Sequence, residues 1–132
     1  MLVVAHRSSL AYIAQKQVGK MDKLALQVDF RFRRLNKMQA LTLSRELEDV
    51  VYTEHLENDS TRSPYRFDAL VRLCASKLDA ISMFYVRQGL NVDQCDILIR
   101  ANPTVTPCFT LPTVVNQMLK HIDCALSFSL EC

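Results

Sequence analysis

The sequence predicts an all-α protein that forms an intertwined helical dimer, and three observations point to this fold class. Apolar residues recur every three or four positions from Ser63 to Gly89, which is the spacing of one helix face. The chain has only 2 glycines and 4 prolines among 132 residues, so it is poor in residues that build turns. The predicted helix is long and its apolar face is broad, so a second subunit is expected to cover it.

The N-terminal region, residues 1–62, is expected to form a separate helical unit with uneven charge. Residues 1–40 are rich in Lys and Arg, whereas residues 41–60 are rich in Asp and Glu. A first short helix is expected between Ser8 and Gly19. The basic part either pairs with the acidic part or offers cations to a polyanion, and the charge pattern leaves both interpretations open.

The next stretch, Leu24–Phe32, satisfies two patterns at once. Its apolar residues alternate strictly with other residues, as in a half-buried strand. The same residues also fit a helix, because Leu24, Val28 and Phe32 are four positions apart. We expect a helix that continues to Val51, because an isolated strand would lack a partner. A short strand near residues 24–32 is the alternative.

Residues 57–64 are the clearest loop in the sequence, since they are rich in Asn, Asp, Ser and Pro. They separate the N-terminal region from a second unit, residues 63–132. The long helix of this second unit is expected to begin with Ser63 as its cap and with Pro64 in its first turn. Gly89 supplies the left-handed turn that ends the helix.

After the long helix, the chain is expected to form two more helices and a short strand. Asn91 can cap a short helix over residues 91–100 that ends before Pro103. Thr110 can cap the next helix. The last stretch, residues 124–130, alternates apolar residues with serine, which indicates a short strand.

Motifs typical of enzymes are missing from the sequence. Glycine occurs only at positions 19 and 89, which excludes a Gly-rich phosphate loop and a nucleophile elbow. The 3 histidines are far apart, and none stands beside a nucleophile in a hydrolase pattern. The sequence therefore predicts a protein that is not an enzyme and has no cofactor.

The 5 cysteines are an odd number without a close pair, which does not fit a secreted disulfide framework. A cytoplasmic location is therefore expected. A membrane span is not expected, because charged residues interrupt the longest apolar stripe. Cys95, Cys108, His121 and Cys124 are ligand types that zinc takes, but the chain has no Cys-x2-Cys pair. We expect no metal site and interpret these thiols as buried or interfacial.

The candidate for nucleic-acid contact is a group of four cations within seven residues, beside Phe30 and Phe32. Cations at this density neutralise phosphates and make binding sensitive to salt. The alternative interpretation is a basic face that pairs with the acidic segment after residue 45. The candidate DNA-binding residues are Arg31, Arg33, Arg34 and Lys37.

A stand-alone ribbon-helix-helix regulator is a further alternative. In that protein, Leu24–Phe32 would form the ribbon and residues 39–56 the first helix. Such ribbons put polar side chains into the groove and apolar ones beneath. The second helix would lie beyond a long loop.

Four stretches of residues 66–130 form a recognisable order. They are Leu78-Asp79-Ala80-Ile81, residues 91–100, Thr110-Leu111-Pro112 with Val115, and Cys124 followed by Leu126-Ser127-Phe128. In these stretches, about half of the chain resembles the FlhD subunit of the bacterial flagellar master regulator, most closely at Thr110-Leu111-Pro112.

The resemblance implies an all-helical homodimer that assembles with a larger, zinc-containing FlhC-like partner on promoter DNA. The chain is similar in kind to the FlhD-like activators that some conjugative elements carry to switch on their transfer genes. In the family, the cysteine matched by Cys124 lies at the dimer contact and can bridge the subunits. The residues expected at the dimer interface are Phe67, Leu70, Cys74, Leu78, Ile81, Tyr85, Cys124 and Phe128.

We therefore predict a subunit of a heteromeric DNA-binding transcriptional activator. Its residues 63–132 would form an FlhD-like dimerisation domain, and the complex would contact DNA without any association with a membrane. The alternatives are a helical protein-interaction adaptor without a nucleic-acid role and the ribbon-helix-helix regulator.

Overall fold

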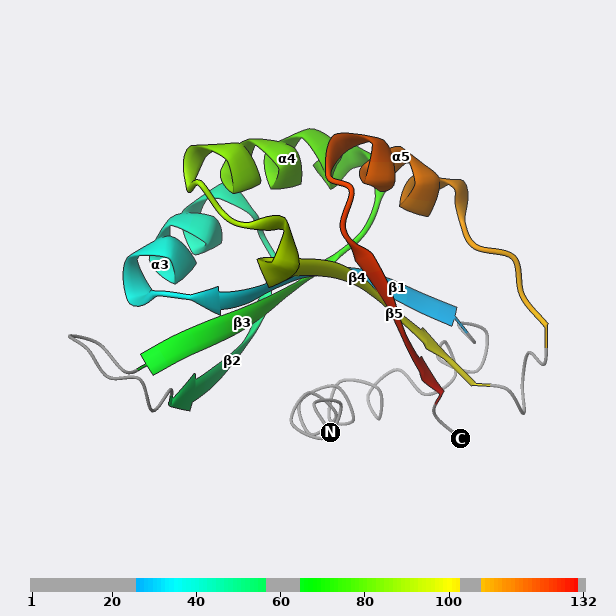
Figure 1. Ribbon diagram of the computed structural model, residues 1–132, viewed down its shortest axis with the longest axis horizontal. Helices are drawn as coiled ribbons and strands as arrows, with labels where there is room; N and C mark the ends of the chain where they lie inside the picture. Colours follow the sequence, from blue (N-terminus) through cyan, green and yellow to red (C-terminus); the bar gives the residue numbers. More distant parts are fainter. Residues whose placement is uncertain (1–25, 57–64, 103–107, 131–132) are drawn as a thin grey trace.

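The protein is built on a five-stranded β-sheet with helices on one face, so the predicted all-α fold is wrong (Figure 1). The computed structural model describes residues 26–56, 65–102 and 108–130. The strand order is β2-β3-β1-β4-β5, and each neighbouring pair is antiparallel except β4 with β5. The elements are β1 (Leu26–Leu35), α3 (Lys37–Glu46), β2 (Val51–Leu56), β3 (Tyr65–Arg72), the 3-10 turn η1 (Ala75–Lys77), α4 (Leu78–Arg87), the 3-10 turn η2 (Val92–Gln94), β4 (Cys95–Ala101), α5 (Thr113–His121) and β5 (Ala125–Leu130).

β1 occupies the centre of the sheet, and its sequence offers a different kind of side chain to each face. Val28, Phe30 and Phe32 belong to the hydrophobic core, whereas Asp29 and Arg31 alternate with them on the opposite face. The alternation in this stretch therefore marks a strand, and the helix expected there is wrong. The partners that such a strand needs are β3 and β4, which lie far away in the sequence.

β1 ends in a β-bulge next to α3. The pairing with β3 slips between Phe32 and Leu35, so β1 contains one extra residue there. Arg34, inside the bulge, has a φ of 58°, in the left-handed region that a non-glycine residue adopts at a cost. The bulge ends the regular pairing and turns the chain toward the helix layer.

α3 is shorter than the helix expected from the sequence. Asn36 forms a capping box with Gln39: each side chain accepts a hydrogen bond from the other residue's backbone N–H. The helix ends at Glu46, and Asp49 has a φ of 60° in the turn that follows. Val51 then begins β2 and does not continue the helix.

The stretch from Ser63 to Gly89 contains two elements, β3 and α4, so the single long helix expected there is wrong. Near the end of β3, Ala69, Leu70 and Val71 are consecutive buried residues, because both faces of the strand are covered. Such a run fits the spacing of a helix as well as that of a buried strand. The helical part is α4, and Gly89 follows it with a φ of 61°, as expected for a helix end.

The C-terminal third adds a strand, a helix and a second strand. The short helix expected at residues 91–100 is wrong, because Asn91 caps only the turn η2, and η2 leads into β4. Every residue of β4 is buried, which again hides the period of a strand. The helix expected after Thr110 is present as α5, but it begins at Thr113 with Pro112 as its N-cap, so the predicted cap at Thr110 is wrong. The strand expected at residues 124–130 is confirmed as β5.

The first six elements, from β1 to β4 without the short turns, form a split βαβ arrangement of the ferredoxin-like kind. α5 and β5 extend it, because α5 connects β4 with its parallel neighbour. Figure 1 shows α3, α4 and α5 on the same side of the sheet. The sheet takes strands from both sides of residue 62. The helix expected at 8–19 and the loop expected at 57–64 lie outside the described residues.

The hydrophobic core lies between the sheet and the helices. Phe30, Phe32 and Phe84 form a chain of edge-to-face ring contacts, with centroids 4.9 Å and 5.1 Å apart, and these contacts connect β1 to α4. Val115 and Met118 of α5 are fully buried in the same cluster. The apolar face of α4 is thus covered within one chain.

Candidate functional site

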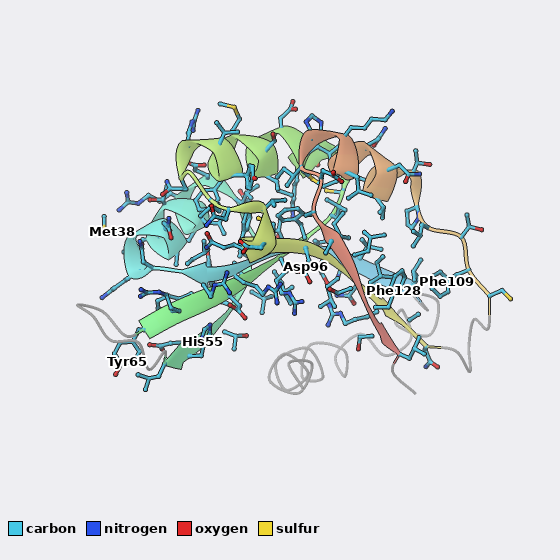
Figure 2. The ribbon with its side chains drawn as sticks, in the orientation of Figure 1. Met38, His55, Tyr65, Asp96, Phe109 and Phe128 are labelled. Carbon is cyan, nitrogen blue, oxygen red and sulfur yellow. The ribbon has the colours of Figure 1, made fainter. Side chains whose placement is uncertain are left out.

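The face of the sheet opposite the helices, called the polar face below, carries charged side chains. The strand registers place Asp29 and Arg31 of β1 on the same face as Arg72 of β3 and as Asp96 and Arg100 of β4. Figure 2 labels Asp96 near the middle of the sheet. Apart from Arg72, these side chains belong to residues that are between 1% and 7% exposed. Charges buried to this degree require partners.

Arg31 and Asp96 form a bidentate ion pair between β1 and β4. Arg31 Nε donates to Asp96 Oδ1 at 2.8 Å, and Arg31 Nη2 donates to Asp96 Oδ2 at 2.5 Å. Ser127 Oγ, from β5, donates to Asp96 Oδ2 at 2.6 Å. Paired N–H···O bonds of this kind are demanding in their geometry. One carboxylate therefore connects three strands.

Asp29 is the second carboxylate that connects strands. Arg100 Nη2 and Gln27 Nε2 both donate to Asp29 Oδ2, the latter at 3.2 Å. Arg72 Nε donates to Asp29 Oδ1 at 3.4 Å. Because both oxygens of Asp29 and of Asp96 accept hydrogen bonds, neither carboxylate is presented as a general base.

The polar face contains more guanidinium donors than acceptors. Within the described part of the chain, three buried nitrogens, Arg31 Nη1, Arg33 Nε and Arg100 Nε, have no hydrogen-bond partner. A buried donor without a partner typically costs about 1–3 kcal/mol. The register places five arginines and three aspartates on this face, namely Arg31, Arg33, Arg66, Arg72 and Arg100 with Asp29, Asp68 and Asp96.

A basic corner lies where β1 ends and α3 begins, and we define it as Arg33, Arg34, Lys37 and Arg66. The bulge of β1 lies against β3 here, and the Arg34 backbone N–H inside the bulge donates to Asp68 Oδ1 at 3.1 Å. Arg34 and Lys37 are exposed, and Arg33 and Arg66 are partly exposed. Cations from two strands and one helix therefore meet at one end of the sheet.

Three cations of the basic corner have no acidic partner in the described segments. Within residues 26–56, 65–102 and 108–130, Arg33, Arg34 and Lys37 form no ion pair. Glu46, from the acidic segment, instead lies 3.7 Å from Arg87. Asp68 already accepts from the Arg34 backbone and contacts a ring nitrogen of His55 at 3.2 Å.

The four residues predicted to contact DNA fall into two groups. Arg31 is 3% exposed and bound to Asp96, so it belongs to the interior of the protein. Arg33, Arg34 and Lys37 belong to the basic corner. The ribbon-helix-helix arrangement is absent from the described residues, because β1 is the central strand of the sheet and residues 51–56 form β2.

The residues predicted for a dimer interface lie mostly inside one chain. The stripe along α4 faces the core of its own chain, and one residue of the set stands out as exposed, at 57%. Leu70, Leu78, Ile81 and Cys124 are buried, Phe67, Cys74 and Tyr85 are partly exposed, and Phe128 is the exposed residue.

The core contains two thiols whose ionisation is suppressed. Burial, together with the nearby Cys124 and Asp96, raises the pKa of Cys95 to about 12. Burial likewise raises the pKa of Cys124 to about 11. A hydrogen bond with Ser76 lowers the pKa of the partly exposed Cys74. Because nucleophilic attack needs the thiolate, the two core thiols are poor nucleophiles near neutral pH.

In the part of the chain that the structure describes, no group of three or more His, Cys, Asp or Glu residues is arranged to hold a metal ion. Of the cysteines and histidine weighed as zinc ligands, Cys108 and His121 are exposed, whereas Cys95 and Cys124 are in the core. None of the described helices combines the length and the hydrophobicity that crossing a bilayer requires.

Comparisons with known proteins find no relative of this chain. No family model, curated protein or solved structure matches it. Residues 66–130 contain β4, β5 and most of β3, so the all-helical fold expected for this part of the chain is wrong.

The sequence interpretation missed the contributions of β3 and β4 to the polar face. Asp96 and Arg100 flank a short apolar run, and a charge at each end of such a run is a signal that its alternate positions face something polar. Arg66 and Arg72 bracket the buried part of β3 in the same way. The sequence contains these signals, but the helical interpretation of both stretches gives these charges no common face.

Proposed function

We propose that the protein is a DNA-binding regulatory subunit that holds the phosphate backbone with its basic corner. The observation that supports this proposal is the meeting of Arg33, Arg34, Lys37 and Arg66 at one end of the sheet. Within the described residues, Arg33, Arg34 and Lys37 form no ion pair. Such cations neutralise phosphates and release counterions, which makes binding favourable and sensitive to salt.

The geometry favours contact with the backbone of DNA rather than with base edges. The basic corner consists of side chains at a sheet end and a helix start, and such contacts position a duplex without reading its sequence. Lys37 is the first residue of α3, where the helix dipole also favours a phosphate. Arg31 has no part in this surface, because Asp96 occupies its guanidinium.

Sequence preference is then expected to come from a partner subunit. The resemblance to FlhD implies a homodimer that acts in the cytoplasm with an FlhC-like, zinc-containing partner on promoter DNA, and these remain part of the proposal. The intertwined all-helical dimer is not part of it, because a sheet stands in its place. No catalytic step is assigned to the protein.

The proposal is tested by fluorescence anisotropy with a short mixed-sequence duplex at about 50 mM and about 200 mM salt. The full chain is expected to bind, with an affinity that falls steeply as salt rises. The variant Arg33→Gln/Arg34→Gly/Lys37→Gln removes three charges, and Gly at position 34 accommodates the φ of 58°. For this variant, the slope of the logarithm of the binding constant against the logarithm of the salt concentration is expected to be smaller in magnitude by about 2 to 3.

A matched control separates a local contact from the effect of net charge. Arg45→Gln/Lys77→Gln/Lys120→Gln removes the same charge from the helix layer, and its slope is expected to stay close to that of the parent. Equal slopes for the two triple variants, or no binding by the parent at low salt, would contradict the proposal. Adding the products of neighbouring genes then tests whether a partner confers sequence preference.

A second candidate function, a protein-interaction adaptor, is favoured by the exposed apolar residues of β5. Phe128 and Leu130 are 57% and 67% exposed on a strand at the edge of the sheet. Exposed apolar residues on an edge strand mark a surface that another chain can cover. An adaptor would bind its protein partner and show no salt-dependent binding of DNA.

A further inference from the structure

β5 has a hydrogen-bonding edge that no described strand occupies. It is the last strand in the order β2-β3-β1-β4-β5, and β4 is its single neighbour there. Alternate backbone N–H and C=O groups on its outer side therefore point away from the sheet. Its exposed apolar residues, Phe128 and Leu130, stand at the same edge, and Figure 2 shows Phe128 on this strand.

The two edge strands of the sheet differ in their protection against pairing. β2 contains Glu54 and His55 in its second half, and charged residues on an edge strand discourage another strand from pairing with it. β5 has the sequence Ala-Leu-Ser-Phe-Ser-Leu and contains no charged residue, no proline and no glycine. One edge is therefore guarded, and the other has the composition of a strand that pairs.

We propose that β5 pairs antiparallel with β5 of a second copy of this chain, so that two sheets join into one. In an antiparallel pair, residues directly opposite each other lie on the same face. A two-fold axis at Phe128 meets this condition along the strand. It places Phe128 opposite Phe128 of the second copy, Leu126 opposite Leu130, and Ser127 opposite Ser129.

The composition of β5 matches this register on both faces. Apolar side chains meet apolar ones on the helix side, and serines meet serines on the polar face, where cross-strand pairs of each kind are stabilising. The equivalent pairing of β2 about Glu54 would oppose two carboxylates, which is unfavourable. The second copy is thus a better occupant for β5 than for β2.

This interface differs from the one predicted on α4, because the stripe of α4 is covered within its own chain. It is also independent of DNA binding, since the basic corner lies on β1, α3 and β3. A chain that fails to bind DNA could still pair through β5, and a monomeric chain could still bind DNA. The two proposals therefore fail separately.

Sedimentation velocity of the full chain between about 1 and about 100 µM tests the proposal. The parent is expected to shift from monomer to dimer over this range. Leu130→Lys introduces a charge opposite Leu126 twice in the dimer, so self-association is expected to weaken by roughly tenfold or more. Leu56→Lys on β2 is the matched control, because Leu56 is also an exposed leucine at the end of an edge strand, and it should behave like the parent.

A cross-link identifies the contact without relying on a variant that weakens it. In a Cys74→Ser/Cys108→Ser/Cys132→Ser background, which removes the reactive thiols and leaves the buried ones, Phe128→Cys is expected to form a covalent dimer on mild oxidation, because residues opposite each other have Cβ atoms about 4.5–5.5 Å apart. Leu56→Cys in the same background is expected to stay monomeric. A parent that is monomeric at the highest concentration, or a cross-link that forms equally through position 56, would overturn the proposal.

Discussion

The two faces of β1 bury side chains of opposite character to nearly the same degree. Phe30 and Phe32 are 0% exposed on the helix side, while Asp29 and Arg31 are 4% and 3% exposed on the polar face. The phenylalanines are stabilised by removal of apolar surface from water. The charged residues are stabilised only through their partners, since each would be costly to bury alone. Burial at the centre of this sheet therefore has two separate physical causes.

The difference also indicates what specifies the register of β1. A slip of one residue would move the charged side chains into the core and the aromatic rings onto the polar face. The ion pair between Arg31 and Asp96 adds a second constraint, because its two hydrogen bonds form only when these residues stand opposite each other. Removing one partner of this ion pair tests the cost of an unpaired buried charge, and removing both tests whether apolar side chains can replace the pair.

The largest effect is expected when one partner of the buried pair is removed. Asp96→Asn deletes the charge that Arg31 faces and leaves a guanidinium buried without a counterion. The free energy of unfolding is expected to fall by about 3–5 kcal/mol, as measured by urea denaturation. Asp93→Asn, at an exposed position in η2, should change it by no more than about 0.5 kcal/mol. A loss below about 1 kcal/mol for Asp96→Asn would mean that the pair is not buried as described.

A smaller effect is expected when both partners are replaced together. Arg31→Met/Asp96→Leu exchanges the ion pair for apolar side chains, which removes the cost of desolvating two charges. Its free energy of unfolding is expected to return to within about 1–2 kcal/mol of the parent, measured in the same denaturant series. Ser127 would lose its acceptor, so the recovery should be incomplete. A double variant as unstable as Asp96→Asn would show that the polar face depends on its charges rather than on being filled.

The smallest effect at neutral pH concerns Cys95, on the apolar side of β4. Burial raises its pKa from 9.0 to about 12, so the thiol is neutral in the folded chain. Its contribution is fully present below pH 9 and is lost as the pH rises from 9 toward 12, because unfolding then releases a thiol that ionises. The fall in unfolding free energy above pH 9 should be shallower for Cys95→Ala than for the parent. Identical slopes for Cys95→Ala and the parent above pH 9 would contradict a raised pKa at Cys95.

The sequence predicts single elements of this fold well where one face of an element is covered. α5 and β5 are confirmed, and the alternation in β1 shows both faces of the strand, although an isolated strand seemed to lack a partner. β3 and β4 are buried on both faces, so their runs of apolar residues carry no period of their own. The β3 run continues into α4 at a spacing that fits one long helix, and this produced the all-α prediction.

The basic corner was predicted in part for a similar reason. Arg33, Arg34 and Lys37 are close in the sequence, so their charge density was visible without the fold. Arg66 joins them through the pairing of β1 with β3, which no local pattern contains. Arg31 is close to these residues in the sequence but lies outside the basic corner, because it pairs with Asp96, which is 65 residues further along the chain.

The position of β1 has a consequence for co-translational folding. β1 is the first described strand to be translated, yet it becomes the middle of the sheet and must hold β3 on one side and β4 on the other. Until β4 follows, a nascent chain that has emerged only as far as η1 exposes an unpaired flank of its central strand. Slow translation or truncation in that interval would leave an aggregation-prone intermediate, so chaperone demand should peak while residues 73–94 emerge from the ribosome.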